Sequence, residues 1–254
     1  MKFNVGEWVM KPGVTSYNCE QIRQVRVAQD GKSVYLYAVS YRADVRGLDG
    51  PSLELTISSP RRDVLRVQAC HFRGSRAKMP SFELNDEASA LAIEQNETGL
   101  CVSSGEMTLE IAFRPCAFRF FYRGKWVTAV GDRFGSPMLS YITTNEGPFM
   151  RGQLEVGVGE KVYGLGERFT AFVKNGQTVD IWNEDGGTSS EIAYKNIPFY
   201  LTNRGYGVLV NDPGPVSFEV CTEAATKVQF SVPGEKLDFL VIGGGDAKGV
   251  LRAY

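Results

Sequence analysis

Histidine is almost missing from this chain, because His71 is the only one among 254 residues. A zinc site built from several histidines is therefore excluded, and a Ser-His-Asp triad would have to use this single ring. His71 lies in the strand-like segment 67–72, where we expect a hydrogen-bonded structural histidine. The sequence therefore excludes most kinds of histidine-based catalysis.

Paired cysteines are missing as well. The five cysteines are odd in number and far apart, and no Cys-x-x-Cys pair suggests a zinc site or a dithiol switch. No other cluster implies a metal ion or an organic cofactor, so we expect neither. Buried free thiols are predicted at Cys19, Cys70, Cys101, Cys116 and Cys221.

Neither sign of charge dominates, since 28 lysines and arginines stand against 29 aspartates and glutamates. Without a strong net field, we expect no nucleic acid partner and no membrane partner. No apolar run has the length of a secretory signal at the start or of a membrane span later. A cytoplasmic protein is expected, in which the glycosylation sequon Asn96-Glu97-Thr98 is a chance occurrence.

Alternating apolar and polar residues are what the chain has in abundance, and period-two alternation is typical of strands with one buried face. Residues 107–113 show it clearly. Pairs of such runs flank turn signals, which favours hairpins. These pairs lie at 25–39 around Asp30-Gly31, at 118–130 around Arg123-Gly124-Lys125 and at 228–241 around Pro233-Gly234.

The frequent strands and the scarcity of helical periodicity predict an all-β fold, a large two-sheet antiparallel β-sandwich. The chain is 43% apolar, which is enough for one large core, and no linker marks a second domain. A short helix is expected near the C-terminus, with Asp246 as its N-cap and Val250, Leu251 and Tyr254 at helical spacing. Because no stop signal follows, we expect the chain to be a fragment.

Residues 156–211 hold the most specific motifs of the chain. This segment resembles the signature of family 31 glycoside hydrolases, most of all the bacterial α-xylosidases, whereas residues 1–150 share only a looser pattern with the N-terminal β-sandwich of that family. That sandwich is itself similar to the galactose mutarotases. The motifs that carry the resemblance are residues 156–170, 175–178, 182–189, 194–200 and 202–211.

The resemblance implies that residues 1–254 are the N-terminal domain of a longer enzyme whose catalytic (β/α)8 barrel is absent from this chain. In such retaining enzymes two barrel carboxylates act as nucleophile and acid/base, and neither has a counterpart here, so no catalytic residue is predicted. The domain would pack on the barrel of the same parent chain and contribute a loop to the sugar pocket. The substrates of the parent would be α-linked xylose or glucose saccharides.

The loop after Trp182 is the predicted substrate-binding element. Gly186-Gly187 allows a tight turn from which Asp185 and Thr188 project, and the resemblance implies that Asp185 binds the non-reducing sugar. A solvated turn aspartate is the alternative. Trp182 either stacks on a pyranose ring or, as its strand-like context 179–182 favours, packs in the core or against the neighbouring domain.

Other motifs are weaker. Gly164-Leu165-Gly166-Glu167 lacks the third glycine of a dinucleotide fingerprint, since Phe169 stands there, and Gly243–Gly245 lacks the lysine of a phosphate loop. Glu160 and Glu167 are not expected to be catalytic. Arg168 is expected to form an ion pair across a domain boundary or a hydrogen bond to a loop carbonyl.

Two other functions remain open. A free-standing carbohydrate-binding or structural adaptor module would bind saccharides or partners without chemistry of its own. An aldose epimerase would need a histidine with a carboxylate, and only His71 is available. Because the absent barrel would leave an apolar face uncovered, self-association into a homo-oligomer is a further expectation.

Overall fold

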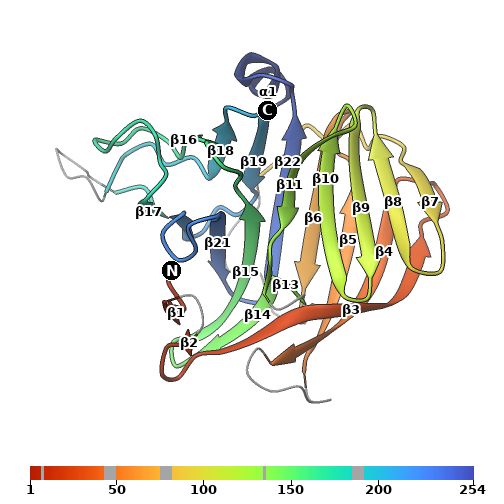
Figure 1. The fold of residues 1–254 in the computed structure, drawn as a ribbon, viewed down its shortest axis with the longest axis horizontal. Helices are drawn as coiled ribbons and strands as arrows, with labels where there is room; N and C mark the ends of the chain where they lie inside the picture. The colour runs from red at the N-terminus through yellow and green to blue at the C-terminus, as the bar shows by residue number, and fades with distance from the viewer. Residues whose placement is uncertain (7–8, 43–49, 75–81, 134–135, 185–191) are drawn as a thin grey trace.

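The computed structural model describes residues 1–6, 9–42, 50–74, 82–133, 136–184 and 192–254. Within these ranges the chain is mostly strand, and the strands form two layers that meet along one side (Figure 1). Neighbouring strands of both layers pair antiparallel, as in the registers of β3 with β4 and β9 with β10. The predicted all-β sandwich is confirmed.

The first layer is continuous through eight strands. In spatial order they are β3 (Thr15–Val27), β4 (Ser33–Arg42), β5 (Ser52–Ser58), β6 (Val64–Cys70), β22 (Lys236–Gly243), β19 (Tyr206–Val210), β18 (Phe199–Thr202) and β16 (Val162–Gly164).

The second layer has nine strands in the order β7 (Ala92–Gln95), β8 (Gly99–Ser104), β9 (Met107–Phe113), β10 (Cys116–Tyr122), β11 (Lys125–Val130), β15 (Gly147–Glu155), β21 (Lys227–Pro233), β20 (Val216–Val220) and β17 (Gln177–Ile181). Strand β14 (Leu139–Thr144) pairs with both β3 and β15 and so joins the layers. Among the described residues there are also two small ribbons: β1 (Asn4–Val5) with β2 (Val9–Met10), and β12 (Asp132–Arg133) with β13 (Ser136–Pro137).

Alternation along the strands places the core between the layers. In β9, Met107, Leu109 and Ile111 are almost completely buried, whereas Glu110 is exposed. These side chains belong to one continuous apolar cluster with residues of β4, β5, β21 and β22. The predicted hairpins at 25–39 and 118–130 are both present, as β3–β4 and β10–β11.

The third predicted hairpin is wrong, because the two runs within 228–241 belong to different layers. Strand β21 pairs with β15 and β20, whereas β22 pairs with β19 and β6. Their aromatic side chains meet across the core instead, with 5.2 Å between the ring centroids of Phe230 and Phe239. A hairpin within one layer and a corner between two layers can have the same alternation and the same Pro-Gly turn. Local sequence therefore does not distinguish them.

The predicted C-terminal helix is present as α1 (Ala247–Ala253). Asp246 caps it, because its Oδ1 accepts a hydrogen bond of 2.7 Å from Gly249 N. Val250 is fully buried in a small cluster with Phe199, Leu240 and Ile242, while Leu251 is exposed. Ala253 packs against the same cluster, and Tyr254 stacks on Phe199 with 4.0 Å between the ring centroids. Helix α1 therefore covers the outer face of the first layer mainly through Val250. The described residues include no helix long and apolar enough to span a membrane.

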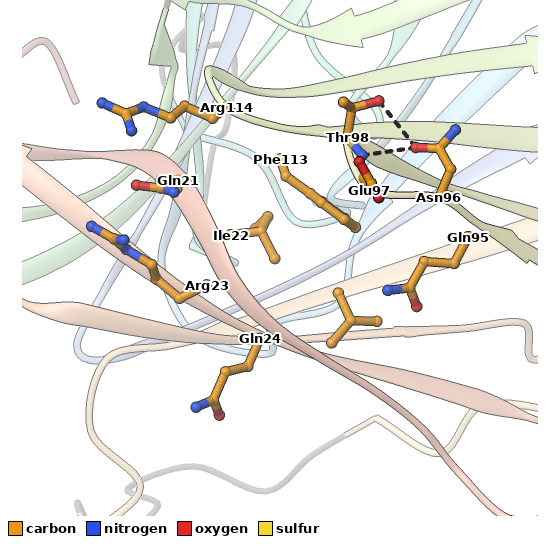
Figure 2. A pocket seen from close by; sticks show the side chains of 11 residues that line it. Gln21, Ile22, Arg23, Gln24, Gln95, Asn96, Glu97, Thr98, Phe113 and Arg114 are labelled. Carbon is orange, nitrogen blue, oxygen red and sulfur yellow. Dashed lines mark hydrogen bonds between the residues drawn. The ribbon is translucent and has the colours of Figure 1, made fainter.

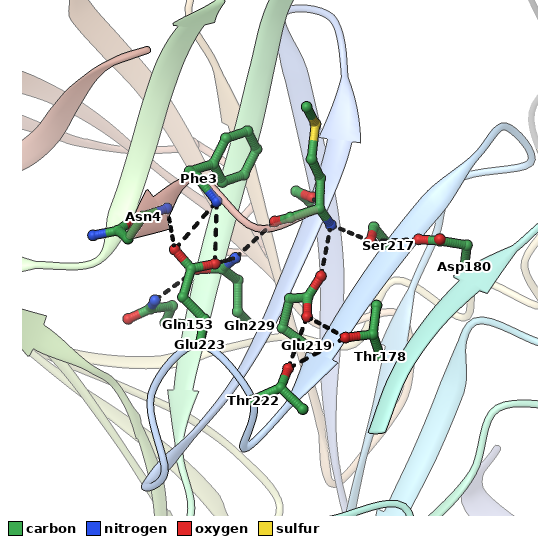
Figure 3. A network of polar contacts seen from close by, with 12 residues as sticks. Phe3, Asn4, Gln153, Thr178, Asp180, Ser217, Glu219, Thr222, Glu223 and Gln229 are labelled. Atoms are coloured by element: carbon green, nitrogen blue, oxygen red, sulfur yellow. Dashed lines mark hydrogen bonds and ion pairs between the residues drawn. The ribbon is translucent and has the colours of Figure 1, made fainter. Parts of the chain in front are cut away.

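The first residues of the chain are bound to the second layer by a polar network (Figure 3). The Met1 ammonium group lies 3.2 Å from Glu219 Oε1 and donates to Ser217 Oγ. Glu223 accepts hydrogen bonds from the backbone amides of Phe3 and Asn4. Burial lowers the pKa of the ammonium group, and the nearby Glu219 carboxylate opposes part of that effect.

All five cysteines are free thiols. Cys19, Cys70 and Cys116 are buried as predicted, whereas Cys101 and Cys221 are only half-buried. For these two the expectation of burial is wrong, because Cys101 lies on the outer face of β8, where alternate residues face solvent, and Cys221 directly follows β20.

Candidate functional site

Within residues 156–211, the backbone of 164–167 lies close to the backbone of 195–199. Gly164, Leu165 and Gly166 all have positive φ angles, of 109°, 65° and 87°. Leu165 N and Glu167 N donate to the carbonyls of Phe199 and Lys195 at 2.8 and 2.9 Å. A Cβ atom on Gly166 would lie 2.1 Å from the Lys195 carbonyl oxygen. The two glycines are therefore required by conformation and by space, which explains the motif without a nucleotide.

Arg168 ties this turn to the neighbouring strand. Its guanidinium donates to the carbonyl of Asp180 at 2.6 Å and to Asn196 Oδ1, and its Nε donates to the carbonyl of Leu165 at 3.3 Å. Burial lowers the pKa of Arg168, and the Asp180 carboxylate partly offsets this effect. The expected hydrogen bond to a loop carbonyl is confirmed.

Asn196 is the central residue of the loop support, the residues of 164–168, 180–184 and 193–196 that hold the ends of the loop between β17 and β18. Its Nδ2 donates to the carbonyls of Trp182 and Ala193 at 2.7 and 2.8 Å, and to Asn183 Oδ1 at 3.1 Å. Its backbone amide also donates to Asn183 Oδ1 at 3.0 Å. One amide side chain thus fastens both ends of the loop between β17 and β18, a role that sequence reasoning did not assign to it.

The two ends of that loop lie side by side. Asn183 and Ala193 form a parallel bridge, and Glu184 N donates to the Ala193 carbonyl at 3.0 Å. Between them lie residues 185–191, which include the predicted sugar-binding residues Asp185 and Thr188. Both residues fall outside the described part of the chain. The described residues therefore form the support of the predicted loop. Sugar binding by Asp185 and Thr188 at its tip stays a prediction.

Exposed aromatic side chains surround this support. Trp182 is 51% exposed, so the interpretation as a core residue of this domain is wrong, and a sugar contact or a contact with a neighbouring domain remains. Phe169, Phe172 and Tyr194 are exposed on the same two loops, at 70%, 79% and 64%. The loops that carry them link β16 to β17 and β17 to β18 at one end of the molecule (Figure 1). Such exposure on neighbouring loops is typical of a binding or docking surface.

Glu160 and Glu167 occupy different environments. Glu160 is buried, accepts a hydrogen bond of 2.8 Å from Gly157 N and lies 3.3 Å from Arg204 Nε. Glu167 is mostly exposed and pairs with Lys195 at 3.2 Å. Burial, with a smaller contribution from the Glu160 carboxylate, raises the pKa values of Tyr200 and Tyr206 well above the ordinary value. Glu160 therefore stabilises the turn after β15.

His71 is a hydrogen-bonded structural residue, as predicted. Its Nδ1 lies 2.6 Å from Glu235 Oε2, and its ring stacks on Tyr141 with 4.0 Å between centroids. The backbone amide of His71 also donates to the Glu235 carbonyl at 2.9 Å. The pair joins the end of β6 to the turn between β21 and β22. Across the described residues, no group of three or more histidine, cysteine or acidic side chains could hold a metal ion.

The two layers form a large antiparallel β-sandwich of the galactose mutarotase-like class, and the loop support lies at one end of it. Residues 54–219 match the family described as the glycosyl hydrolase 31 N-terminal galactose mutarotase-like domain, and the chain belongs to this family. The match contains the whole loop support, from Gly164 to Asn196.

Two curated relatives align with all of this chain. An α-xylosidase of Emericella nidulans is 36% identical, and the α-xylosidase XylQ of Lactiplantibacillus pentosus is 38% identical. The chain spans 35% and 33% of these two proteins, about a third of their length.

Solved structures share the fold at low identity. The cycloalternan-forming enzyme from Listeria monocytogenes, in complex with a pentasaccharide substrate, has a TM-score of 0.73 at 19% identity, covering 92% of this chain and 21% of that one. A family 31 α-xylosidase from a soil metagenome, complexed with xylose, has a TM-score of 0.66 at 16% identity, covering 87% and 32%. At these identities the likeness establishes the fold alone.

Proposed function

We propose that this chain is the non-catalytic β-sandwich domain of a retaining α-glycosidase that acts on α-xylosides or α-glucosides. The domain packs on a (β/α)8 barrel of the same parent chain and contributes the loop between β17 and β18 to the sugar pocket. The family match and the two α-xylosidase relatives support the proposal. Cleavage itself is assigned to carboxylates outside this chain.

The observation that carries the loop assignment is the support built by Asn196. A loop that binds a ligand needs fixed ends, because ordering a free loop on binding would use up part of the binding energy. Here Asn196 and the Asn183–Ala193 bridge hold both ends before any ligand arrives. Asp185 and Thr188 then supply hydrogen-bonding groups for sugar hydroxyls, and Trp182 supplies an aromatic face.

The exposed apolar side chains of these loops provide the contact with the barrel in this proposal. Phe169, Phe172 and Ile197 are exposed beside the same loop, and large apolar side chains are favourable in such a position only when another surface covers them. In the isolated domain this face would be uncovered, so self-association into a homo-oligomer is expected there.

The proposal is tested on the complete parent enzyme with Asp185→Ala, using an aryl α-xyloside and an aryl α-glucoside. Loss of a hydrogen bond from a carboxylate to a sugar should lower kcat/KM by about ten- to a hundredfold, with unchanged thermal unfolding. The control is Asp30→Ala, which removes an exposed turn aspartate between β3 and β4. Unchanged kinetics for Asp185→Ala with both substrates would leave the domain a scaffold.

Trp182→Ala tests the proposed sugar contact of that side chain against the alternative, a contact with the barrel. If the ring stacks on the sugar, kcat/KM falls while the melting temperature of the parent stays the same. If the ring packs on the barrel, the melting temperature falls or the two domains unfold separately, with a smaller kinetic effect. If neither changes, the tryptophan belongs to neither surface.

A further inference from the structure

We propose that a second saccharide site lies at the other end of the domain, in an open groove between β3 and the turns that follow β7 and β9. The groove has a volume of about 420 Å³. Its ligand class is a short neutral oligosaccharide, bound without chemistry. The site goes beyond the function proposed above, because it uses none of the residues of the loop between β17 and β18.

One wall of the groove is made by an irregular stretch of β3. The register of β3 with β4 shifts between Cys19 and Gln21 and again between Ile22 and Gln24. Such irregularities bend a strand and redirect side chains. Ile22 is buried here, whereas the neighbouring Arg23 and Gln24 are exposed and line the groove.

The opposite wall is the turn between β7 and β8, which is held rigid by its own side chain. Asn96 Oδ1 accepts three hydrogen bonds, from Thr98 N, Thr98 Oγ1 and Gly99 N, at 2.9, 3.0 and 2.9 Å. These bonds use the oxygen of the amide and leave its Nδ2 group available as a donor. The sequon at 96–98 thus has a structural role as an Asx turn.

The floor is apolar, and polar groups surround it. Figure 2 shows the Phe113 ring and Ile22 in the middle, with Arg23, Arg114 and Gln21 on one side and Gln95 and Asn96 on the other. Phe113 is half-buried against the main core, so its position is set by packing. A half-exposed aromatic ring surrounded by amides and guanidinium groups is suited to the C–H face and the hydroxyl edge of a sugar.

Apart from the Asn96 oxygen, part of the hydrogen-bonding capacity of the lining side chains is unused within the described part of the chain. There the side chains of Gln24, Gln95 and Arg114 have no protein partner. Amides both donate and accept, which matches hydroxyl groups better than it matches phosphate or carboxylate. The lining carries two arginines against one glutamate, Glu97, so its net charge of +1 is too small to favour a polyanion.

The groove lies away from the face on which the barrel is proposed to dock, so it stays open in the parent enzyme. Strands β7 and β3 border it at the right side of Figure 1, whereas the loops after β16 and β17 lie at the left side. A barrel that docks on the exposed aromatic residues of those loops therefore leaves the groove free. A saccharide held there would raise the local concentration of longer substrates near the enzyme.

The experiment is a titration of the 254-residue chain with maltotriose, isomaltotriose and xylotriose, followed by amide chemical shifts. We expect saturable shifts at millimolar concentration, confined to residues 21–25, 95–98 and 113–114. Shifts at residues 182–184 and 192–197 would report on the other site, so the two proposals succeed or fail separately. A salt titration with sodium chloride should change the affinity less than about twofold, because the ligand is neutral.

Substitutions then assign the contacts. Gln24→Ala and Arg114→Ala remove exposed side chains and should each weaken binding about fivefold, the effect of one hydrogen bond. Arg26→Ala is the matched control, because Arg26 is on the same strand, stacks over Tyr35 and does not line the groove. Phe113→Ala should abolish binding, and its amide spectrum checks that the fold is retained.

Three results would overturn the proposal. The first is the absence of shifts in the groove with all three trisaccharides. The second is equal binding by Gln24→Ala, Arg114→Ala and the unchanged chain. The third is tighter binding of trigalacturonate than of the neutral trisaccharides, with strong weakening by salt, which would assign the two arginines to an anion site.

Discussion

At the scale of single residues, the loop support depends on two kinds of residue, glycine and asparagine. Gly166 is needed because its φ angle is positive and because the Lys195 carbonyl occupies the space of a Cβ atom. Asn196 is needed because one amide group bonds to three backbone or side-chain oxygens. Both residues act on the shape of the loop support, and neither has to touch a ligand.

Gly166→Ala should destabilise the domain by about 3 kcal/mol or more, since a left-handed conformation and a backbone clash are combined. Gly176→Ala is a matched control, because Gly176 has nearly the same φ angle, 86°, and no described residue beyond its two chain neighbours has an atom within 4 Å of the point where its Cβ would be. It should cost about 1 kcal/mol, the conformational part alone. Urea unfolding measures both, and equal losses would contradict the role of the Lys195 contact.

Asn196→Asp should destabilise the loop support by about 2 kcal/mol, because the substitution keeps the size and replaces the Nδ2 donor with an oxygen that faces carbonyl groups. The control is Asn145→Asp on the exposed turn between β14 and β15, which should be nearly neutral. Hydrogen exchange of the Glu184 amide, which bonds to Ala193, gives a local readout. An unchanged exchange rate would show that the bridge holds without Asn196.

At the scale of elements, the packing of β15, β21 and β22 connects the two layers. Gly152 of β15 lies beneath Phe230, whose Cε2 atom would be 2.6 Å from an added Cβ. Leu237 of β22 would be 3.4 Å away. The absent side chain at position 152 therefore makes room for the aromatic contact between Phe230 and Phe239 that joins the layers.

Gly152→Ala should destabilise the domain by about 2 kcal/mol through overpacking, and Phe230→Leu by about 1 kcal/mol or more through lost contacts. The double variant should be more stable than the sum of the two losses predicts, because the smaller leucine leaves space for the methyl group. Chemical denaturation of the four proteins gives the coupling energy. Strict additivity would show that Phe230 does not limit the space at residue 152.

At the scale of the whole molecule, the core contains titratable groups that stay neutral while they are buried. Tyr200 and Tyr206 are fully buried, and burial raises their pKa values well above 10. In the unfolded chain they ionise near the ordinary value of about 10. Below that pH both states keep the protons, so the stability is unaffected. Above it the unfolded chain loses them first, so the stability falls as the pH rises.

Two such tyrosines should lower the free energy of unfolding by about 2.7 kcal/mol per pH unit above about pH 10. Tyr200→Phe should remove about half of this slope and leave the stability near neutral pH almost unchanged, because no hydrogen bond to the Tyr200 hydroxyl is present among the described residues. Urea unfolding at a series of alkaline pH values measures the slope. An identical slope in the variant would mean that Tyr200 ionises in the folded protein.

The class of fold, the hairpins at 25–39 and 118–130, the helix capped by Asp246 and the family could all be predicted from the sequence. These features depend on alternation, turn chemistry and local motifs, which act between residues close in the chain. Three others became visible only in the folded chain: β21 and β22 belong to different layers, Trp182 is exposed, and Asn196 holds the loop. They depend on which distant strands meet, and period-two alternation is the same whichever partner a strand takes.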